Sequence, residues 1–305
     1  TVAVDLGAGT NTLALDNNDV LLNPAEMSSL VFTDAAVSVS GVSTLEFVDG
    51  GSWGLFNNQE ATLDLAGLDG LDTIRFAESV DFFADNGNGI TLANAPEALT
   101  IDFVQSGVYI DLDVGDVQTL TMTAGNTLGF NSGVLEGAAL RSATLSAGDS
   151  VLLNINGNVA SLQSLTVEAP SANLAIADAP ALASLDLSGV TDSMSVNLTG
   201  ANLAGALTID LGTAAGVLSA DGALAQEVFA FVGDNIGDIS INNYTAGVGS
   251  NGDRLDFSGY AGVDSLGDLS ITWDGANSAL TSDAFDGTIT VVGVDVSTDA
   301  FNFIF

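Results

Sequence analysis

The chain lacks three residue types on which most catalytic and metal sites depend. Its 305 residues contain no cysteine, no histidine and no lysine, and its three basic residues are Arg75, Arg141 and Arg254. The absence of cysteine excludes a disulfide scaffold and thiolate metal sites. The absence of histidine removes the base of Ser-His and Cys-His nucleophiles, and the absence of lysine removes Schiff-base chemistry and the P-loop. We therefore expect a protein that is not an enzyme.

Positive charge is correspondingly scarce. Against the three basic residues stand 39 acidic ones, and the formal net charge is −36. Because binding to phosphate requires cations, nucleic acid and anionic membrane are disfavoured as partners. Hydrophobic residues make up 47% of the chain, which argues against a disordered acidic tail. Self-repulsion of this size is tolerable in high salt, with bound divalent cations, or in an extended shape that spreads the charge.

Long apolar runs and N-terminal targeting signals are missing as well. No run reaches the roughly 18 apolar residues of a transmembrane helix, so we expect no membrane span. No basic segment followed by an apolar stretch opens the chain. The first residue is Thr1 rather than methionine, which indicates a processed chain or a piece of a longer one.

What the sequence does contain is a repeat of short alternating segments. In each segment the first and third positions are apolar or small and the second and fourth are polar, which is the period of a half-buried strand. The segments are LTID at 99–102, LTMT at 120–123, ATLS at 143–146, LTVE at 165–168, LDLS at 185–188 and LTID at 207–210. A second strand family begins near Val108, Leu128, Leu153, Leu174, Val196 and Val217. Both families recur about every 22 residues.

A fixed repeat of this length predicts stacked structural units. We predict an all-β fold, a parallel β-solenoid (β-helix) whose rungs have about 22 residues and two strands. Each strand would pair with its equivalent one rung on, about 4.8 Å away, and the inward Leu, Val and Ile would form a continuous core. A two-sheet sandwich also contains many short strands and is the alternative. A sandwich, however, does not keep a nearly constant interval over six units.

The regularity of the pattern divides the chain into three parts. Residues 1–98 are rich in strand patterns but irregular, and we interpret them as irregular rungs continuous with the solenoid. Residues 99–226 form the regular solenoid, and residues 227–305 form a C-terminal β module with a different pattern.

The C-terminal part carries an ordered set of motifs. They are GDISINNYTAGVG (237–249), DRLDFSGY (253–260), ITVVGV (289–294) and DAFNFIF (299–305). Their order and spacing resemble the C-terminal module of repeats-in-toxin and type I secreted proteins, which include bacterial surface-layer proteins and adhesins. The resemblance covers about a quarter of the chain. The family's tandem calcium nonapeptide is not present as a run, and DLGAGTNTL (5–13) and GLDGLDTI (67–74) are degenerate echoes of it.

The resemblance implies type I export of a bacterial protein to the cell surface or the medium, an uncleaved C-terminal signal, and Ca²⁺ as the cofactor. Calcium takes six to eight oxygen ligands, which carboxylates and the carbonyls of glycine-rich turns supply. The candidate ligands are Asp234, Asp238, Asn251, Asp253 and Asp256, with DNGNG (85–89) as a weaker candidate. The alternative for each is an Asx-turn, in which the side chain caps its own turn.

Together these features predict a secreted, calcium-stabilised structural protein that assembles with itself into an extracellular surface layer or filament. A second expected partner is cell-surface polysaccharide. The alternatives are a calcium-dependent adhesin segment that binds glycan or surfaces, and a β-helix enzyme that acts on polysaccharide through paired carboxylates. The end segments TVAVDL and FNFIF could add to a neighbouring copy by β-augmentation. FNFIF could instead be the export signal or an intramolecular strand.

Overall fold

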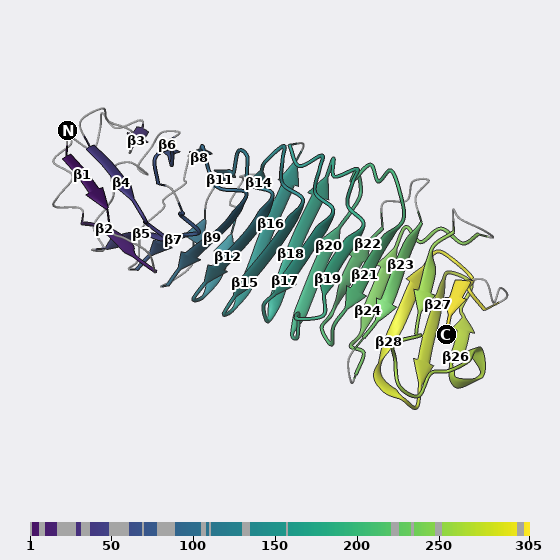
Figure 1. Cartoon of the computed structure of the whole chain (residues 1–305). Coiled ribbons are helices and arrows are strands. Elements are labelled where there is room, and N and C mark those ends of the chain that lie inside the picture. Colours follow the sequence, from purple (N-terminus) through teal and green to yellow (C-terminus); the bar gives the residue numbers. More distant parts are fainter. Residues whose placement is uncertain are drawn as a thin grey trace. The chain divides into compact units, whose positions relative to one another are not determined.

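The computed structural model groups the chain into two compact units, Thr1–Val159 and Ala160–Phe305 (Figure 1). The structure describes residues 2–5, 10–16, 29–31, 37–48, 61–68, 70–77, 89–104, 108–109, 111–129, 135–156, 158–220, 226–232, 235–247, 252–297 and 302–305. These ranges contain β-strands and one 3-10 helix, η2 (Leu266–Asp268), and no α-helix. The three-part division expected from the sequence stays a prediction.

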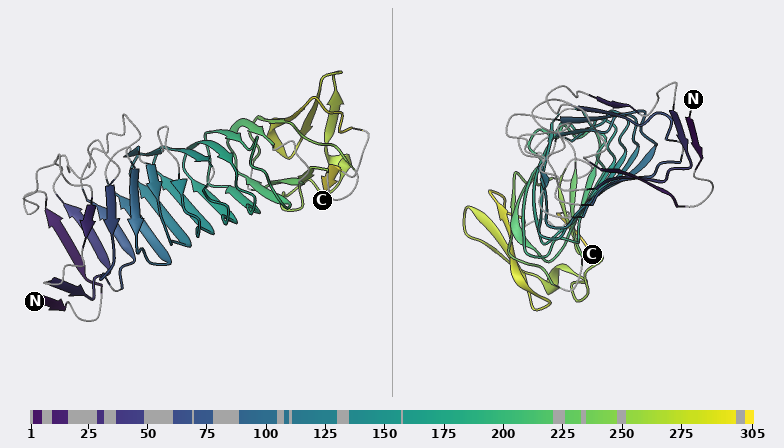
Figure 2. Two further views of the ribbon diagram at one scale, coloured as in Figure 1. Left: turned by 90° about the horizontal axis from the view of Figure 1, so that it is seen from above. Right: turned by 90° about the vertical axis from the view of Figure 1, so that its left-hand side faces the viewer.

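The first unit is a stack of parallel rungs. Its strands are β1 (Val2–Asp5), β2 (Thr12–Asp16), β3 (Ser29–Val31), β4 (Val37–Ser40), β5 (Thr44–Val48), β6 (Ala61–Asp64), β7 (Thr73–Phe76), β8 (Gly89–Ala93), β9 (Ala98–Phe103), β10 (Val108–Tyr109), β11 (Asp111–Asp113), β12 (Thr119–Ala124), β13 (Thr127–Gly129), β14 (Leu135–Glu136), β15 (Ser142–Ala147) and β16 (Ser150–Asn156). One sheet, here called the β2–β15 sheet, has the order β2-β5-β7-β9-β12-β15, and its strands lie side by side in the left view of Figure 2. The other sheets of this unit have the orders β1-β4, β3-β6-β8-β11-β14 and β10-β13-β16.

The second unit repeats this construction and ends in an antiparallel meander. Its strands are β17 (Ser164–Glu168), β18 (Ser171–Ala177), β19 (Ser184–Leu187), β20 (Ser193–Asn197), β21 (Leu207–Leu211), β22 (Ala215–Ser219), β23 (Glu227–Phe231), β24 (Ile239–Asn242), β25 (Arg254–Asp256), β26 (Ser270–Trp273), β27 (Asn277–Ser282), β28 (Phe285–Val292) and β29 (Phe303–Ile304). The β17–β29 sheet has the order β17-β19-β21-β23-β25-β29. The β18–β26 sheet has the order β18-β20-β22-β24-β28-β27-β26, and β26, β27 and β28 pair antiparallel.

The predicted parallel β-solenoid is confirmed, with rungs of about 23 residues. The alternating segments fall on strands of the β2–β15 and β17–β29 sheets. Equivalent residues pair from β9 to β12, from β12 to β15 and from β17 to β19, whereas from β19 to β21 the pairing is shifted by two residues, so that Leu185 pairs with Ile209. Leu99 pairs with Leu120, for example, and Leu120 with Ala143. Because side chains alternate across a strand, a shift of two residues keeps the same face, so inward residues stack on inward residues at each of these steps.

Stacked side chains of like kind fill the interior. The rings of Phe47, Phe76 and Phe103 stack with centroid separations of 4.9 Å at both steps, and all three are buried. In the second unit Phe231 stacks on Phe257 at 4.7 Å. Aromatic rings in such columns bury large apolar areas and gain additional stacking energy, so the columns stabilise neighbouring rungs against one another.

Three details differ from the sequence expectation. Rungs of the first unit carry a third short strand, as in β9, β10 and β11, because the apolar residues of β11 and its equivalents face the core from another side. The second family is correct in position, but Val217 faces outward, with 44% of its surface exposed, and the paired inward residues are Val196 and Leu218. FNFIF supplies β29, which pairs with β25, so the intramolecular-strand alternative is confirmed.

Candidate functional site

Asp253 lies at the centre of a buried polar cluster in the second unit. Its carboxylate is fully buried, and each oxygen accepts a backbone hydrogen bond. The Glu227 N–H donates to Oδ1 at 3.0 Å and the Thr245 N–H donates to Oδ2 at 2.7 Å. Asp253 thereby joins the start of β23 to the base of the loop that precedes β25. This bonding gives Asp253 a role in folding that requires no cation.

The surrounding residues reinforce the same junction. The Tyr244 hydroxyl donates to the Asp253 carbonyl oxygen at 2.7 Å, and the Gln226 side-chain amide donates to the Gly252 carbonyl at 2.7 Å. A Cβ atom on Gly252 would lie 2.5 Å from the Gly247 carbonyl oxygen, so the close approach of the two backbone segments requires glycine here.

Glu227 is a second buried carboxylate beside Asp253, and sequence analysis did not find it. It is 1% exposed and occupies an inward position of β23, where the alternating burial also places Phe229 and Phe231. Glu227 and Asp253 directly precede Val228 and Arg254, which pair in register. The signal in the sequence was the EVFAF alternation, which places its first residue on the inward face.

The remaining calcium candidates lie apart from this buried cluster or outside the described residues. Asp238 is exposed and its Oδ1 accepts the Thr288 N–H at 2.8 Å. Asp256 is half-buried and its Oδ1 accepts the Ser258 N–H at 2.8 Å, which is an Asx-turn. Asp234 and Asn251 lie outside the described residues, as do positions 85–88 of DNGNG. Calcium binding at the five candidates stays a prediction.

Asx-turns recur along both units. In each, Oδ1 of an Asp or Asn side chain accepts the backbone N–H two residues later, at 2.7–3.0 Å. The residues are Asp64, Asp113, Asp186, Asn197, Asp256, Asp274 and Asp295. These side chains cap turns, and Asp256 is the one calcium candidate among them.

An outward column of acids runs along the β17–β29 sheet. Asp186 pairs with Asp210, Asp210 pairs with Ala230, and Ala230 pairs with Asp256. Partial burial, followed by the negative charges of Asp186 and Asp256, raises the pKa of Asp210 above its ordinary value of 3.8. Burial is the larger of these causes, and the neighbouring carboxylates add to it.

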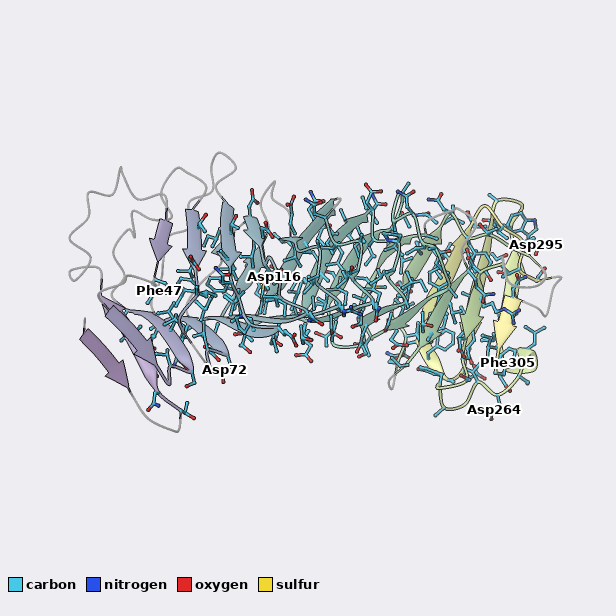
Figure 3. The ribbon with its side chains drawn as sticks, turned by 45° about the horizontal axis from the view of Figure 1, so that its top comes forward. Phe47, Asp72, Asp116, Asp264, Asp295 and Phe305 are labelled. Carbon is cyan, nitrogen blue, oxygen red and sulfur yellow. The ribbon has the colours of Figure 1, made fainter. Side chains whose placement is uncertain are left out.

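In the equivalent outward column of the first unit, an arginine side chain lies between two carboxylates. Glu46, Arg75 and Asp102 are paired in register on β5, β7 and β9. Nε of Arg75 lies 3.7 Å from a Glu46 carboxylate oxygen and 3.5 Å from an Asp102 oxygen. Figure 3 shows acidic side chains such as Asp72, Asp116, Asp264 and Asp295 elsewhere on the surface of the described chain.

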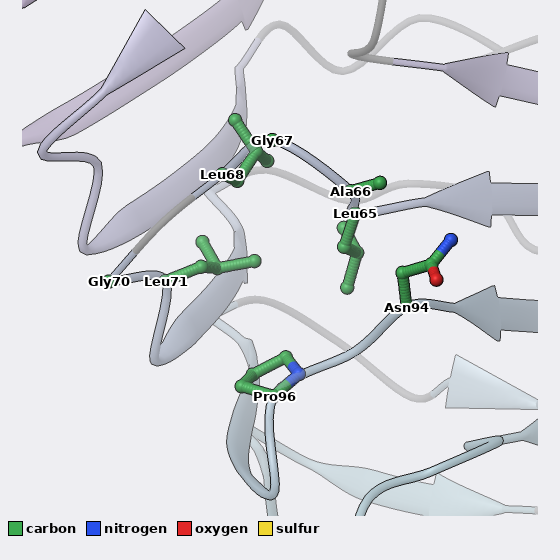
Figure 4. Close-up of a pocket in the computed structure, with 8 residues that line it drawn as sticks. All are labelled: Leu65, Ala66, Gly67, Leu68, Gly70, Leu71, Asn94 and Pro96. Atoms are coloured by element: carbon green, nitrogen blue, oxygen red, sulfur yellow. The ribbon is translucent and has the colours of Figure 1, made fainter.

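A pocket of about 280 Å³ opens in the first unit beside the turn between β6 and β7 (Figure 4). Leu65, Leu68 and Leu71 line it from that turn, and Asn94 and Pro96 line it from the shorter link between β8 and β9. Among the described lining residues, Asn94 has the one polar side chain and the others are apolar.

Within the described ranges, no group of three or more acidic side chains is arranged to hold a metal ion. No helix of the described chain is long and apolar enough to cross a membrane. The comparisons with known proteins returned no matching family model, no matching curated protein and no matching solved structure. The resemblance to repeats-in-toxin and surface-layer proteins therefore rests on the motifs alone.

Proposed function

We propose that this chain is a secreted structural protein whose copies assemble into an extracellular layer or filament, with calcium as the stabilising cation. The observation that carries the proposal is a parallel stack of rungs whose outward faces bear acids with almost no basic residues to balance them. A stack of rungs in which each contacts its neighbours is a building element that extends along one direction.

The electrostatics explain the need for an external cation. With 39 acidic and three basic residues, protein side chains balance a small part of the charge, as Arg75 does in the first unit. In the second unit, Asp186 and Asp210 face one another in register and the pKa of Asp210 is raised. A hard divalent cation with oxygen ligands relieves such repulsion, both within one copy and between the acidic surfaces of two copies.

Calcium also supplies a reason for folding outside the cell. Carboxylates without a cation oppose compaction, and a bound ion adds its binding free energy to the folding free energy. A chain that is loose at low calcium and folded at millimolar calcium suits export followed by assembly.

Electron microscopy and light scattering of the purified 305-residue chain test the proposal. Samples in millimolar calcium, in the same concentration of magnesium, and in chelator are compared side by side. Arrays or filaments that form with calcium and disperse in chelator support it, and magnesium controls for simple charge screening. Assembly in all three samples keeps the structural role and removes calcium from it.

Dispersed monomers in all three samples contradict the assembly proposal. The calcium-dependent adhesin alternative then predicts a monomer that binds glycan, and a glycan-binding screen follows. The β-helix enzyme alternative predicts turnover of a polysaccharide, which the same glycans test directly.

A further inference from the structure

The two end strands of the described solenoid sheets each have a strand neighbour on one edge. In the first unit β2 begins the β2–β15 sheet and pairs with β5. In the second unit β29 ends the β17–β29 sheet and pairs with β25. The Phe257 N–H donates to the Ile304 carbonyl at 2.8 Å, so the backbone groups of Ile304 face β25. Because successive residues of a strand point their backbone groups to opposite edges, those of Phe303 and Phe305 face the outer edge.

The apolar columns are also incompletely covered at these two strands. Leu13 of β2 is half-buried, whereas its paired neighbour Leu45 is fully buried. Phe305 stacks on Phe257 at 6.2 Å and remains 39% exposed (Figure 3). One end presents an aromatic surface and the other the start of an aliphatic column, and the two surfaces can cover one another.

Each end strand has one outward residue that is apolar and whose paired residue in the neighbouring rung is charged. Ala14 of β2 is exposed and pairs with Glu46, and the next residue of that column is Arg75. Ile304 of β29 is half-buried and pairs with Asp256. Edge strands that are protected against association usually carry a charge or a proline. β2 carries the charged residue Asp16 at its last position, whereas Ala14 in the middle of β2 and Ile304 of β29 are neither charged nor proline.

We propose that copies of this chain join head to tail, with the outer edge of β29 in one copy pairing in parallel with the outer edge of β2 in the next. This inference rests on the proposed self-assembly and names its contact. Phe303 lies opposite Leu13 and Ile304 lies opposite Ala14, so the inward and outward faces remain continuous across the joint.

The spacing of charge favours this joint. With Ile304 and Ala14 between them, Asp256 of one copy and Glu46 of the next lie three rung spacings apart, about 14 Å. That separation exceeds the Debye length of about 8 Å at physiological ionic strength, so their repulsion is largely screened. A contact that repeats head to tail without closing generates an open chain of copies, as a filament requires.

Two charge variants and a matched control test the joint, under the conditions in which the unmodified chain assembles. Ala14→Asp places a carboxylate at the β2 end, and Ile304→Asp places one at the β29 end. Ser146→Asp is the control, because Ser146 lies in the same outward column as Ala14 but on the internal strand β15. Circular dichroism and thermal melting establish that all three are folded, and sedimentation velocity measures their size.

We expect each end variant alone to lose all species larger than the monomer, while Ser146→Asp assembles as the unmodified chain does. Mixing the two end variants should give a dimer and nothing larger, because Ala14→Asp keeps an unmodified β29 and Ile304→Asp keeps an unmodified β2. If Ile304→Asp does not fold, Phe305→Pro replaces it, since proline removes an outer-edge N–H and leaves the Ile304 bonds to β25 in place.

The outcomes separate the joint from the wider proposal. Assembly of both end variants, or a mixture that stays monomeric, overturns the head-to-tail joint while the assembling unmodified chain keeps its structural role. If Ile304→Asp still dimerises and Ala14→Asp does not, the copies meet through β2 alone and the joint is also overturned. An unmodified chain that stays monomeric in every ionic condition contradicts the proposed function itself.

Discussion

Replacement of Asp253 by alanine is expected to destabilise the second unit by removing a buried junction. The substitution leaves the N–H groups of Glu227 and Thr245 without the carboxylate oxygens that accept them at 3.0 and 2.7 Å. A buried donor that loses its partner costs about 1–3 kcal/mol. The Glu227 N–H is buried and should cost about that much, whereas the Thr245 N–H is partly buried and should add a smaller amount. This is a large share of the roughly 5–15 kcal/mol by which a domain is stable.

The assay is chemical denaturation of the full chain, combined with hydrogen exchange of the backbone amides in β23 and β25. Asp295→Ala is the matched control, because Asp295 also accepts a backbone N–H, from Ser297 at 3.0 Å, but does so at the solvent-exposed surface. The control should change the free energy of unfolding by about 0.5 kcal/mol or less. Asp253→Asn should fall between the two, because its amide oxygen can accept one of the two bonds.

Performing the measurement in chelator separates the two roles considered for Asp253. The hydrogen bonds predict the same destabilisation with and without calcium. A loss of stability that appears with calcium and vanishes in chelator would refute the bonding argument and favour a ligand role. An Asp253→Ala effect equal to that of Asp295→Ala in both conditions would refute both.

Three further substitutions test the columns. Asp210→Asn should raise the melting temperature at pH 7, because the raised pKa of Asp210 means that its ionised form opposes folding. The wild type gains stability as the pH falls through that raised pKa, so the difference in melting temperature between variant and wild type should shrink toward pH 3.8. Melting curves recorded across this pH range test this. Arg75→Gln removes the cation between Glu46 and Asp102 and should lower the free energy of unfolding by about 1 kcal/mol or less. The loss should be smaller in 1 M salt, and a loss that salt does not change would contradict the ion pairing. Phe76→Ala opens the ring stack and should cost about 3–5 kcal/mol in denaturant unfolding, against a minor loss for Phe76→Leu.

The local sequence determined which residues of a rung form strands and which of their side chains face inward. Alternation in segments such as LTMT at 120–123 fixes which side chains face inward, and the repeat interval fixes that equivalent segments stack. Both are properties of neighbouring residues, because strand periodicity and turn chemistry need no knowledge of distant contacts. For the same reason the sequence indicated the Asx-turns, which bond two residues along the chain, as at Asp256.

The tertiary structure decided what depends on contacts between rungs. It placed the Asp253 carboxylate between the N–H groups of Glu227 and Thr245, because these hydrogen bonds join segments that are separated in the sequence. It aligned Asp186 with Asp210 but set Ala230 between Asp210 and Asp256. The register of one rung on the next sets these pairs, and a shift of one residue would have turned every side chain to the other face. The sequence alone thus determines the charge, the composition and the repeat length, whereas the stacking of rungs determines the hydrogen-bond partners of each buried carboxylate.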